Sequence, residues 1–296
     1  MSNLSGNGCD ILVPFNERIP LRDIEKSLIK KKNRKNLWSK FIKAIKDYSL
    51  VEEGDKIAVA VSGGKDSLVM SKLFQELKRH GQVDFELEFI AMDPGYHESI
   101  RELLIDNCQY LDIPIHLFES KIFEIADEIA KDYPCYMCAR MRRGALYSKA
   151  KELGCNKLAL GHHYDDVIET TMLNLLCSGN FKTMLPKLDS TNFEGIQIIR
   201  PLYYIREEYI SKFIQNAGIW PLNCACMVAA KKTGNKRYEI KELIKNLEKT
   251  FVNVEKSIFR AAENVNVDSV LGWQMDGEKH SFLERFESES KDDELD

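Results

Sequence analysis

The stretch Val59-Ala-Val-Ser-Gly-Gly-Lys-Asp-Ser67 decides how this chain folds. An apolar run ends in two glycines, and a segment of helical period begins near Asp66. Such a turn binds phosphate, because the glycines let backbone N–H groups approach an anion and the helix N-terminus adds unsatisfied donors. Lys65 and the hydroxyls of Ser62 and Ser67 can complete the cradle. The alternative is a strand-to-helix turn in which Asp66 or Ser67 merely caps the helix.

Short β-rich runs and helical segments alternate on both sides of this turn. The predicted strands are residues 56–61, 85–92, 113–118, 157–162 and 196–202, and the predicted helices are residues 66–79, 98–111, 139–153, 164–177 and 206–217. Connections of this length favour a parallel sheet with helices on both faces, which binds ligands at the carboxyl ends of its strands. We therefore expect an α/β, Rossmann-like fold.

The flanking segments have different compositions. Residues 1–50 are expected to be a basic N-terminal helical segment, and residues 51–222 to be the nucleotide-binding domain. Residues 223–272 hold a cysteine-containing loop and two predicted helices, near 238–249 and 251–263. Residues 273–296 are acidic and rich in Ser and Glu, which predicts a disordered tail.

Length and composition limit the class of protein. The chain has 296 residues, 44% of them hydrophobic and 30% charged, as in an ordinary globular protein. No apolar run approaches the ~18 residues of a spanning helix, and the N-terminus has no export signal. We therefore expect a cytoplasmic protein with no membrane partner.

Charge is unevenly distributed along the chain. The formal net charge is −4, yet residues 22–46 hold ten Lys and Arg against Asp23 and Glu25. Residues 139–151 hold five basic residues and no acidic one. The first basic run either grips a nucleic-acid backbone or is a solvated helix face.

Eight cysteines occur in a chain that is too long and too cysteine-poor for a disulfide framework. Two close pairs, Cys135/Cys138 and Cys224/Cys226, are candidate metal ligands. A Cys-x-x-Cys pair suits half a zinc site, a redox dithiol or part of an iron–sulfur cluster. All four could form a Cys₄ zinc site, although Cys-x-Cys is tighter than usual zinc spacing. The remaining cysteines of apolar stretches, Cys108, Cys155 and Cys177, are expected in the core.

The segment Gly161-His-His-Tyr-Asp-Asp166 also follows a predicted strand and precedes a helix. It should therefore lie at the carboxyl edge of the sheet, close to the phosphate turn. Asp166 could hold Mg²⁺ or orient and deprotonate the attacking group, and His162 could contact phosphate or ribose. The alternative makes Asp165 or Asp166 a helix N-cap and both histidines packing residues.

These motifs resemble those of a known family. Ser-Gly-Gly-Lys-Asp-Ser at 62–67 is similar to the pyrophosphate-binding loop of the PP-loop ATPases, which cleave ATP to AMP and pyrophosphate and adenylate a substrate. Three more stretches resemble the tRNA 2-thiocytidine synthetase branch, in the same order: residues 135–144, residues 161–170 and Arg200-Pro-Leu202. The resemblance covers about residues 36–260. It implies an adenine nucleotide alpha hydrolase-like fold and a PP-loop ATP-pyrophosphatase domain at residues 51–222.

The resemblance also implies roles for single residues. Pyrophosphate would bind to Ser62, Gly63, Gly64, Lys65, Asp66 and Ser67. Asp166 matches the proposed catalytic aspartate, Arg142 matches the basic residue that faces the activated intermediate, and Asp93 ends the strand where the family binds adenosine. Gly161 and His162 would join the nucleotide site, and Lys65 with Mg²⁺ would stabilise the departing pyrophosphate.

The cysteines acquire a role through the same resemblance. Three of them would hold a [4Fe–4S] cluster with one iron free for sulfide. Cys135 and Cys138 supply two ligands, and Cys224 is the expected third. Cys226 is the alternative, because the family carries two cysteines there at a different spacing.

The activity implied is ATP-dependent tRNA thiolation, in which ATP adenylates the C2 oxygen of a cytidine and sulfide then displaces AMP. The target base must be unstacked, which suits an anticodon-loop nucleotide. The expected partners are tRNA and a sulfur donor, either sulfide or the persulfide of a cysteine desulfurase, and a homodimer is one option for the assembly. Two other functions stay open: adenylation of another tRNA base or a small molecule, and a zinc-stabilised nucleic-acid-binding module without turnover.

Overall fold

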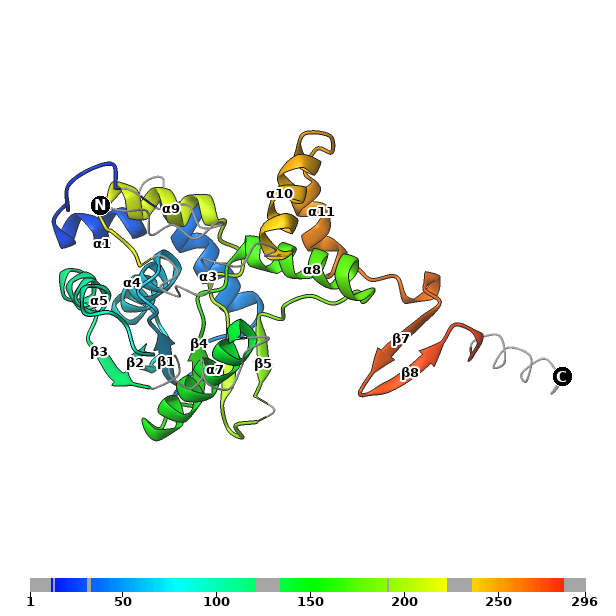
Figure 1. Cartoon of the computed structure of the whole chain (residues 1–296), viewed down its shortest axis with the longest axis horizontal. Coiled ribbons are helices and arrows are strands. Elements are labelled where there is room, and N and C mark those ends of the chain that lie inside the picture. Colours follow the sequence, from blue (N-terminus) through cyan, green and yellow to red (C-terminus); the bar gives the residue numbers. More distant parts are fainter. Residues whose placement is uncertain are drawn as a thin grey trace.

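The computed structural model describes residue 12 and residues 14–30, 33–120, 134–190, 192–222 and 236–284, with only the backbone of 134–139. Within this part a six-stranded sheet forms the centre of the molecule, in the order β3-β2-β1-β4-β6-β5 (Figure 1). The strands are β1(Lys56–Ala60), β2(Glu86–Asp93), β3(Ile115–Glu119), β4(Lys157–Ala159), β5(Lys187–Asp189) and β6(Gln197–Ile199). All neighbours pair in parallel except β5, which is antiparallel to β6.

Helices cover both faces of the sheet. Those between and after the strands are α4(Lys65–His80), α5(Glu98–Tyr110), α7(Pro134–Glu152), α8(Tyr164–Ser178) and α9(Glu207–Asn216). Because alternate strand residues point to opposite faces, Ile57 and Val59 enter the large core with α4, whereas Ala58 packs with Ala150 of α7. This confirms the predicted α/β fold with helices on both faces. The antiparallel edge strand β5 was not predicted, since three residues carry no readable periodicity.

The strand order places a switch point beside β1. From β1 the chain adds β2 and β3 on one side, and it then returns to add β4 on the other side. In open α/β sheets, ligands bind where the strand order reverses, at the carboxyl ends of the strands. The segments that follow β1 and β4 therefore flank the expected binding crevice.

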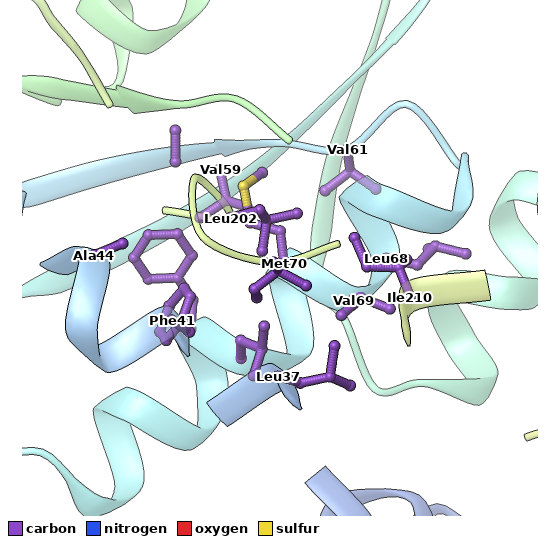
Figure 2. Packing of buried hydrophobic residues seen from close by; sticks show 14 of the residues in the cluster. Leu37, Phe41, Ala44, Val59, Val61, Leu68, Val69, Met70, Leu202 and Ile210 are labelled. Carbon is purple, nitrogen blue, oxygen red and sulfur yellow. The ribbon is translucent and has the colours of Figure 1, made fainter. Parts of the chain in front are cut away.

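The N-terminal helices belong to the same core as the sheet. They are α1(Leu21–Ile29), the short π-helical turn η1(Arg34–Trp38) and α3(Ser39–Asp47). Figure 2 shows Leu37 and Phe41 in one cluster with Val59 of β1 and Met70 of α4. The Phe41 ring meets that of Phe74 edge-on at 5.4 Å. The helices α1, η1 and α3 thus pack against α4 and the central sheet.

The C-terminal region contains α10(Lys236–Glu248), α11(Val254–Ala261) and the 3-10 turn η2(Val267–Ser269), followed by the hairpin β7(Gly272–Met275) and β8(Glu278–Ser281). The hairpin projects from the body (Figure 1), and the prediction of disorder is wrong for residues 273–281. Asp276 and Gly277 both have positive φ, as a two-residue hairpin turn requires. Residues 285–296 lie outside the described residues. No helix in the described part is long and apolar enough to span a membrane.

Candidate active site

The turn after β1 leaves the N-terminus of α4 open to an anion. Gly64 is the N-cap of α4, and no side chain caps the helix. Ser67 Oγ instead accepts the Ser62 N–H at 3.2 Å and donates to the Gly64 carbonyl at 2.9 Å. The first-turn N–H groups of a helix have no partner within the helix, so they can bind phosphate here. The interpretation in which Asp66 or Ser67 caps the helix is therefore wrong.

Gly63 is required by both conformation and space. Its φ of +77° lies in the left-handed region. A Cβ at this position would lie 2.5 Å from Leu222 Cδ1 and 2.9 Å from Leu104 Cδ1. The Leu222 N–H donates to the Gly63 carbonyl at 2.9 Å. The chain just before Cys224 is therefore attached to the phosphate turn.

The segment after β4 meets the same turn. A Cβ on Gly161 would lie 3.3 Å from the Ser67 backbone nitrogen, so the two backbones are in close contact. Burial lowers the pKa of His162 to about 4, which makes the imidazole neutral at neutral pH. Its buried Nδ1 has no hydrogen-bond partner among the described residues. Gly161 and His162 thus flank the phosphate turn, and His162 carries one nitrogen available to a ligand.

Asp166 has a structural part in the N-terminus of α8. His163 is the N-cap, and its Nδ1 accepts the Asp166 N–H at 3.4 Å while Asp166 Oδ2 accepts the His163 N–H at 3.0 Å. Asp166 Oδ1 accepts from Arg237 at 3.1 Å. Burial alone would raise the pKa of Asp166, but His163, His162 and Arg237 lower it overall. The carboxylate is thus ionised and held in place. The N-cap is His163. The alternative in which Asp165 or Asp166 is the N-cap is therefore wrong.

Lys65 is bound by two carboxylates. Its Nζ lies 2.9 Å from Asp66 Oδ2 and 3.1 Å from Glu207 Oε1. Glu207 Oε2 accepts from Lys241 at 2.5 Å. Burial by itself would lower the pKa of Lys65, but the two carboxylates raise it above its usual value. Sequence reasoning missed Glu207, Lys241 and Arg237, because their contacts join segments far apart in the chain.

A cavity of about 930 Å³ opens beside Lys65, between α4, α8, α9 and α10. Charged side chains of both signs line it, among them Asp165, Glu169, Arg206 and Glu207. Burial, and then the nearby Asp166 carboxylate, raise the pKa of Glu169 to about 7. The site therefore combines an ionised Asp166 with a second carboxyl that can carry a proton near neutral pH.

Asp93 and Arg142 lie around the end of β2. Asp93 Oδ1 accepts the N–H groups of Gly95 at 2.9 Å and Tyr96 at 2.7 Å, so this buried carboxylate holds the turn after the strand. Arg142 is half-buried on α7, next to Met141, which packs with Met92 of β2. The structure thus brings α7 to the carboxyl edge of the sheet, where the phosphate turn also lies.

The candidate cluster ligands are described only in part. Cys135 and Cys138 are three residues apart in the first turn of α7, and the structure describes their backbone alone. Cys224 and Cys226 lie outside the described residues. In the ranges that the structure describes, no group of three His, Cys, Asp or Glu side chains could hold a metal ion. Cys108 and Cys155 are buried, as predicted, and burial raises the pKa of both thiols. Cys177 is exposed, so the prediction that it lies in the core is wrong.

Known proteins are similar to this chain in sequence and in fold. Residues 33–221 match the family model of the PP-loop domain. A tRNA-cytidine(32) 2-sulfurtransferase from Pelobacter propionicus is 40% identical over 237 residues, covering 79% of this chain and 87% of the relative. The corresponding protein of Teredinibacter turnerae is 38% identical, covering 76% of this chain and 74% of its own. Among solved structures, the U34-tRNA thiolase NcsA from Methanococcus maripaludis with its [4Fe-4S] cluster superposes with a TM-score of 0.60 and 26% identity over 76% of each chain.

Proposed function

Because the chain belongs to the tRNA-cytidine(32) 2-sulfurtransferase family and contains its PP-loop domain, we propose that it thiolates an anticodon-loop cytidine of tRNA with ATP. The observation that supports this most directly is the contact between two motifs at the switch point. Gly161 lies against the backbone of Ser67, so the phosphate turn and the segment that ends in Asp166 form one site.

The reaction needs ATP because the C2 oxygen of cytosine leaves poorly. The C2 oxygen attacks the α-phosphorus of ATP, the bond to pyrophosphate breaks, and pyrophosphate leaves. Sulfide then adds at C2 and AMP leaves with the former C2 oxygen, while the sulfur loses its proton. The turn from Ser62 to Ser67 would bind the pyrophosphate through backbone N–H groups and the α4 N-terminus.

Asp166 and its neighbours would orient the reacting groups. Asp166 is ionised and held by the His163 backbone and Arg237, so it can accept a hydrogen bond in a fixed direction. His162 would contact phosphate or ribose through its available Nδ1. Arg142 would face the adenylated intermediate from α7. Asp93 Oδ1 accepts two backbone N–H groups in the turn after β2, so Asp93 would contact adenosine through Oδ2.

Mg²⁺ would bind chiefly through the phosphates and water, as it commonly does. A protein ligand is available in Asp66, whose Oδ1 is buried and accepts no hydrogen bond among the described residues. That oxygen lies 3.7 Å from His163 Nε2. The donor chemistry therefore fits one magnesium ion beside the phosphate turn.

We propose that Cys135, Cys138 and either Cys224 or Cys226 hold a [4Fe–4S] cluster, which would supply the sulfur for the second step. The backbone supports this assignment from both sides. Cys135 and Cys138 occupy one helical turn that precedes Met141, which packs at the end of β2. The other segment begins after Leu222, which is hydrogen-bonded to Gly63. Met141, three residues after Cys138, and Leu222, two residues before Cys224, thus both lie at the carboxyl edge of the sheet.

The tRNA backbone would bind the N-terminal basic face. We define this face by the exposed basic residues Arg22, Lys26, Lys30, Arg34, Lys35, Lys43 and Lys46. Of the nearby acidic residues, Glu25 is engaged by Lys72 and Arg79, whereas Asp47 pairs with Lys43 of the face itself. Exposed positive charges are what binding to a phosphate backbone needs.

The remaining partners are also proposals. Sulfide or the persulfide of a cysteine desulfurase would supply sulfur. The protein would act in the cytoplasm, where it would bind its tRNA substrate. A second copy of the chain would bury the exposed apolar side chains at the end of α8, among them Leu175 and Leu176, in a homodimer.

The function is tested with anaerobically purified protein, ATP, Mg²⁺, sulfide and tRNA transcripts. We expect AMP and pyrophosphate only when the tRNA carries cytidine at the target position, and one 2-thiocytidine per AMP in nucleoside digests. A transcript with uridine at that position is the matched control. Cleavage of ATP with equal yield on the control tRNA, or protein that contains zinc but no iron while fully active, would contradict the proposal.

A further inference from the structure

In this structure the ammonium group of Lys65 forms ion pairs with two carboxylates, those of Asp66 and Glu207. Asp66 belongs to the phosphate turn itself, whereas Glu207 comes from another helix. Lys65 is only 16% exposed and Glu207 26%, so water screens this pair less than a surface pair. The ammonium group has three N–H donors, of which two face these carboxylates, so Lys65 can give phosphate oxygens more than one hydrogen bond only if they replace one of the carboxylates.

Glu207 is held where it can make this contact. It is the first residue of α9, where the helix dipole favours a negative charge. Its backbone N–H donates to Asp165 Oδ2 at 2.7 Å, and its second carboxylate oxygen accepts from Lys241. Lys65 and Lys241 hold the pKa of Glu207 at about 2 against the opposing effect of burial. The carboxylate is therefore ionised and fixed from both ends.

On the proposed function, we infer that Glu207 is a positioning residue that acts through Lys65, competing with pyrophosphate for its ammonium group. Lys65 exchanges Glu207 for phosphate oxygens when ATP binds and returns to Glu207 when pyrophosphate leaves. The residue thus weakens the binding of the product and speeds its departure. No bond is made or broken in this exchange; only the ion-pair partner of Lys65 changes.

Because Glu207 competes with pyrophosphate, removing its charge should increase the affinity for pyrophosphate. In Glu207→Gln, Lys65 loses one competing carboxylate, and the full chain should bind pyrophosphate about fivefold more tightly in the presence of Mg²⁺. Damage to the fold would weaken binding instead. The matched control is Glu208→Gln, which makes the same change one residue away, where the side chain is half exposed and paired with Lys212. Its affinity for pyrophosphate should equal that of the wild type.

A second background tests whether Lys65 carries the effect. In Lys65→Met, adding Glu207→Gln should change pyrophosphate affinity by less than about twofold, because the competed group is gone. Isothermal titration of the five proteins, the wild type and the four variants, with magnesium pyrophosphate measures all of these values. Unchanged or weaker pyrophosphate binding by Glu207→Gln overturns the inference. An equal gain in pyrophosphate affinity in the Lys65→Met background also overturns it, because the effect of the Glu207 charge would then not act through Lys65. Wild-type protein that binds neither pyrophosphate nor ATP would instead overturn the proposed phosphate site.

Discussion

Replacing Gly63 by alanine perturbs the phosphate turn at its most constrained point. The added methyl group meets two costs. Gly63 has φ of +77°, where an L-residue is strained by about 1 kcal/mol. The new Cβ would also lie 2.5 Å from Leu222 Cδ1 and 2.9 Å from Leu104 Cδ1, and overpacking of this kind costs about 1–2 kcal/mol.

The magnitude follows from which neighbour can move. Leu222 is half-buried and can rotate, whereas Leu104 is fully buried and cannot. The turn should therefore shift toward Leu222, which moves the N–H groups that would bind pyrophosphate. We expect the free energy of unfolding to fall by about 2–3 kcal/mol and the melting temperature by about 4–12 °C. Pyrophosphate affinity should fall at least about tenfold.

Gly54→Ala is the matched control. Gly54 has nearly the same φ, +80°, but no atom lies within 4 Å of the Cβ that alanine would add. It should lose only about 1 kcal/mol, or about 2–4 °C, and bind pyrophosphate normally. Thermal unfolding followed by circular dichroism and titration with magnesium pyrophosphate compare the two variants. Equal melting temperatures, or wild-type affinity in Gly63→Ala, would refute the steric argument.

Three more expectations concern other parts of the chain. Cys135→Ala should lose cluster iron and thiolation but keep pyrophosphate binding, as shown by anaerobic iron analysis and titration; retained iron would contradict the ligand assignment. Neutralising Lys26, Lys30 and Lys35 should weaken tRNA binding and lower the slope of log affinity against log salt by about 2, whereas an exposed control set, Lys249, Lys256 and Lys279, should leave the slope unchanged. Burial raises the pKa of Glu169 from 4.5 to about 7. Between these pH values the folded chain retains a proton that the unfolded chain has lost, so the free energy of unfolding should fall as the pH rises from 4.5 to about 7. Glu169→Gln should reduce this fall by up to about 2 kcal/mol, and urea unfolding at pH 5 and pH 8 would show an unchanged fall if the reasoning is wrong.

Local patterns were enough to predict the framework of the fold. The apolar run at 56–61 and the helical period after Asp66 correspond to β1 and α4, because side-chain periodicity reports which face of a strand or helix is buried. The two glycines predicted a phosphate turn for an equally local reason, since the left-handed φ of Gly63 depends on its own lack of a side chain. The hairpin of residues 272–281 has a local signal too, Asp276-Gly277, which lies within the acidic composition that predicts disorder.

The sequence by itself therefore determined the α/β order, the phosphate turn and the motifs at the strand ends, whose geometry is set within a few residues. Only the tertiary structure decided which side chains surround them. Asp166 is shared between the α8 cap and Arg237, and Lys65 is paired with Glu207. Such pairs depend on how α9 and α10 pack beside α4 and α8, and hence on the whole set of buried contacts between elements. No local pattern encodes those contacts, because a lysine and a glutamate read the same in the sequence whether they meet or face water.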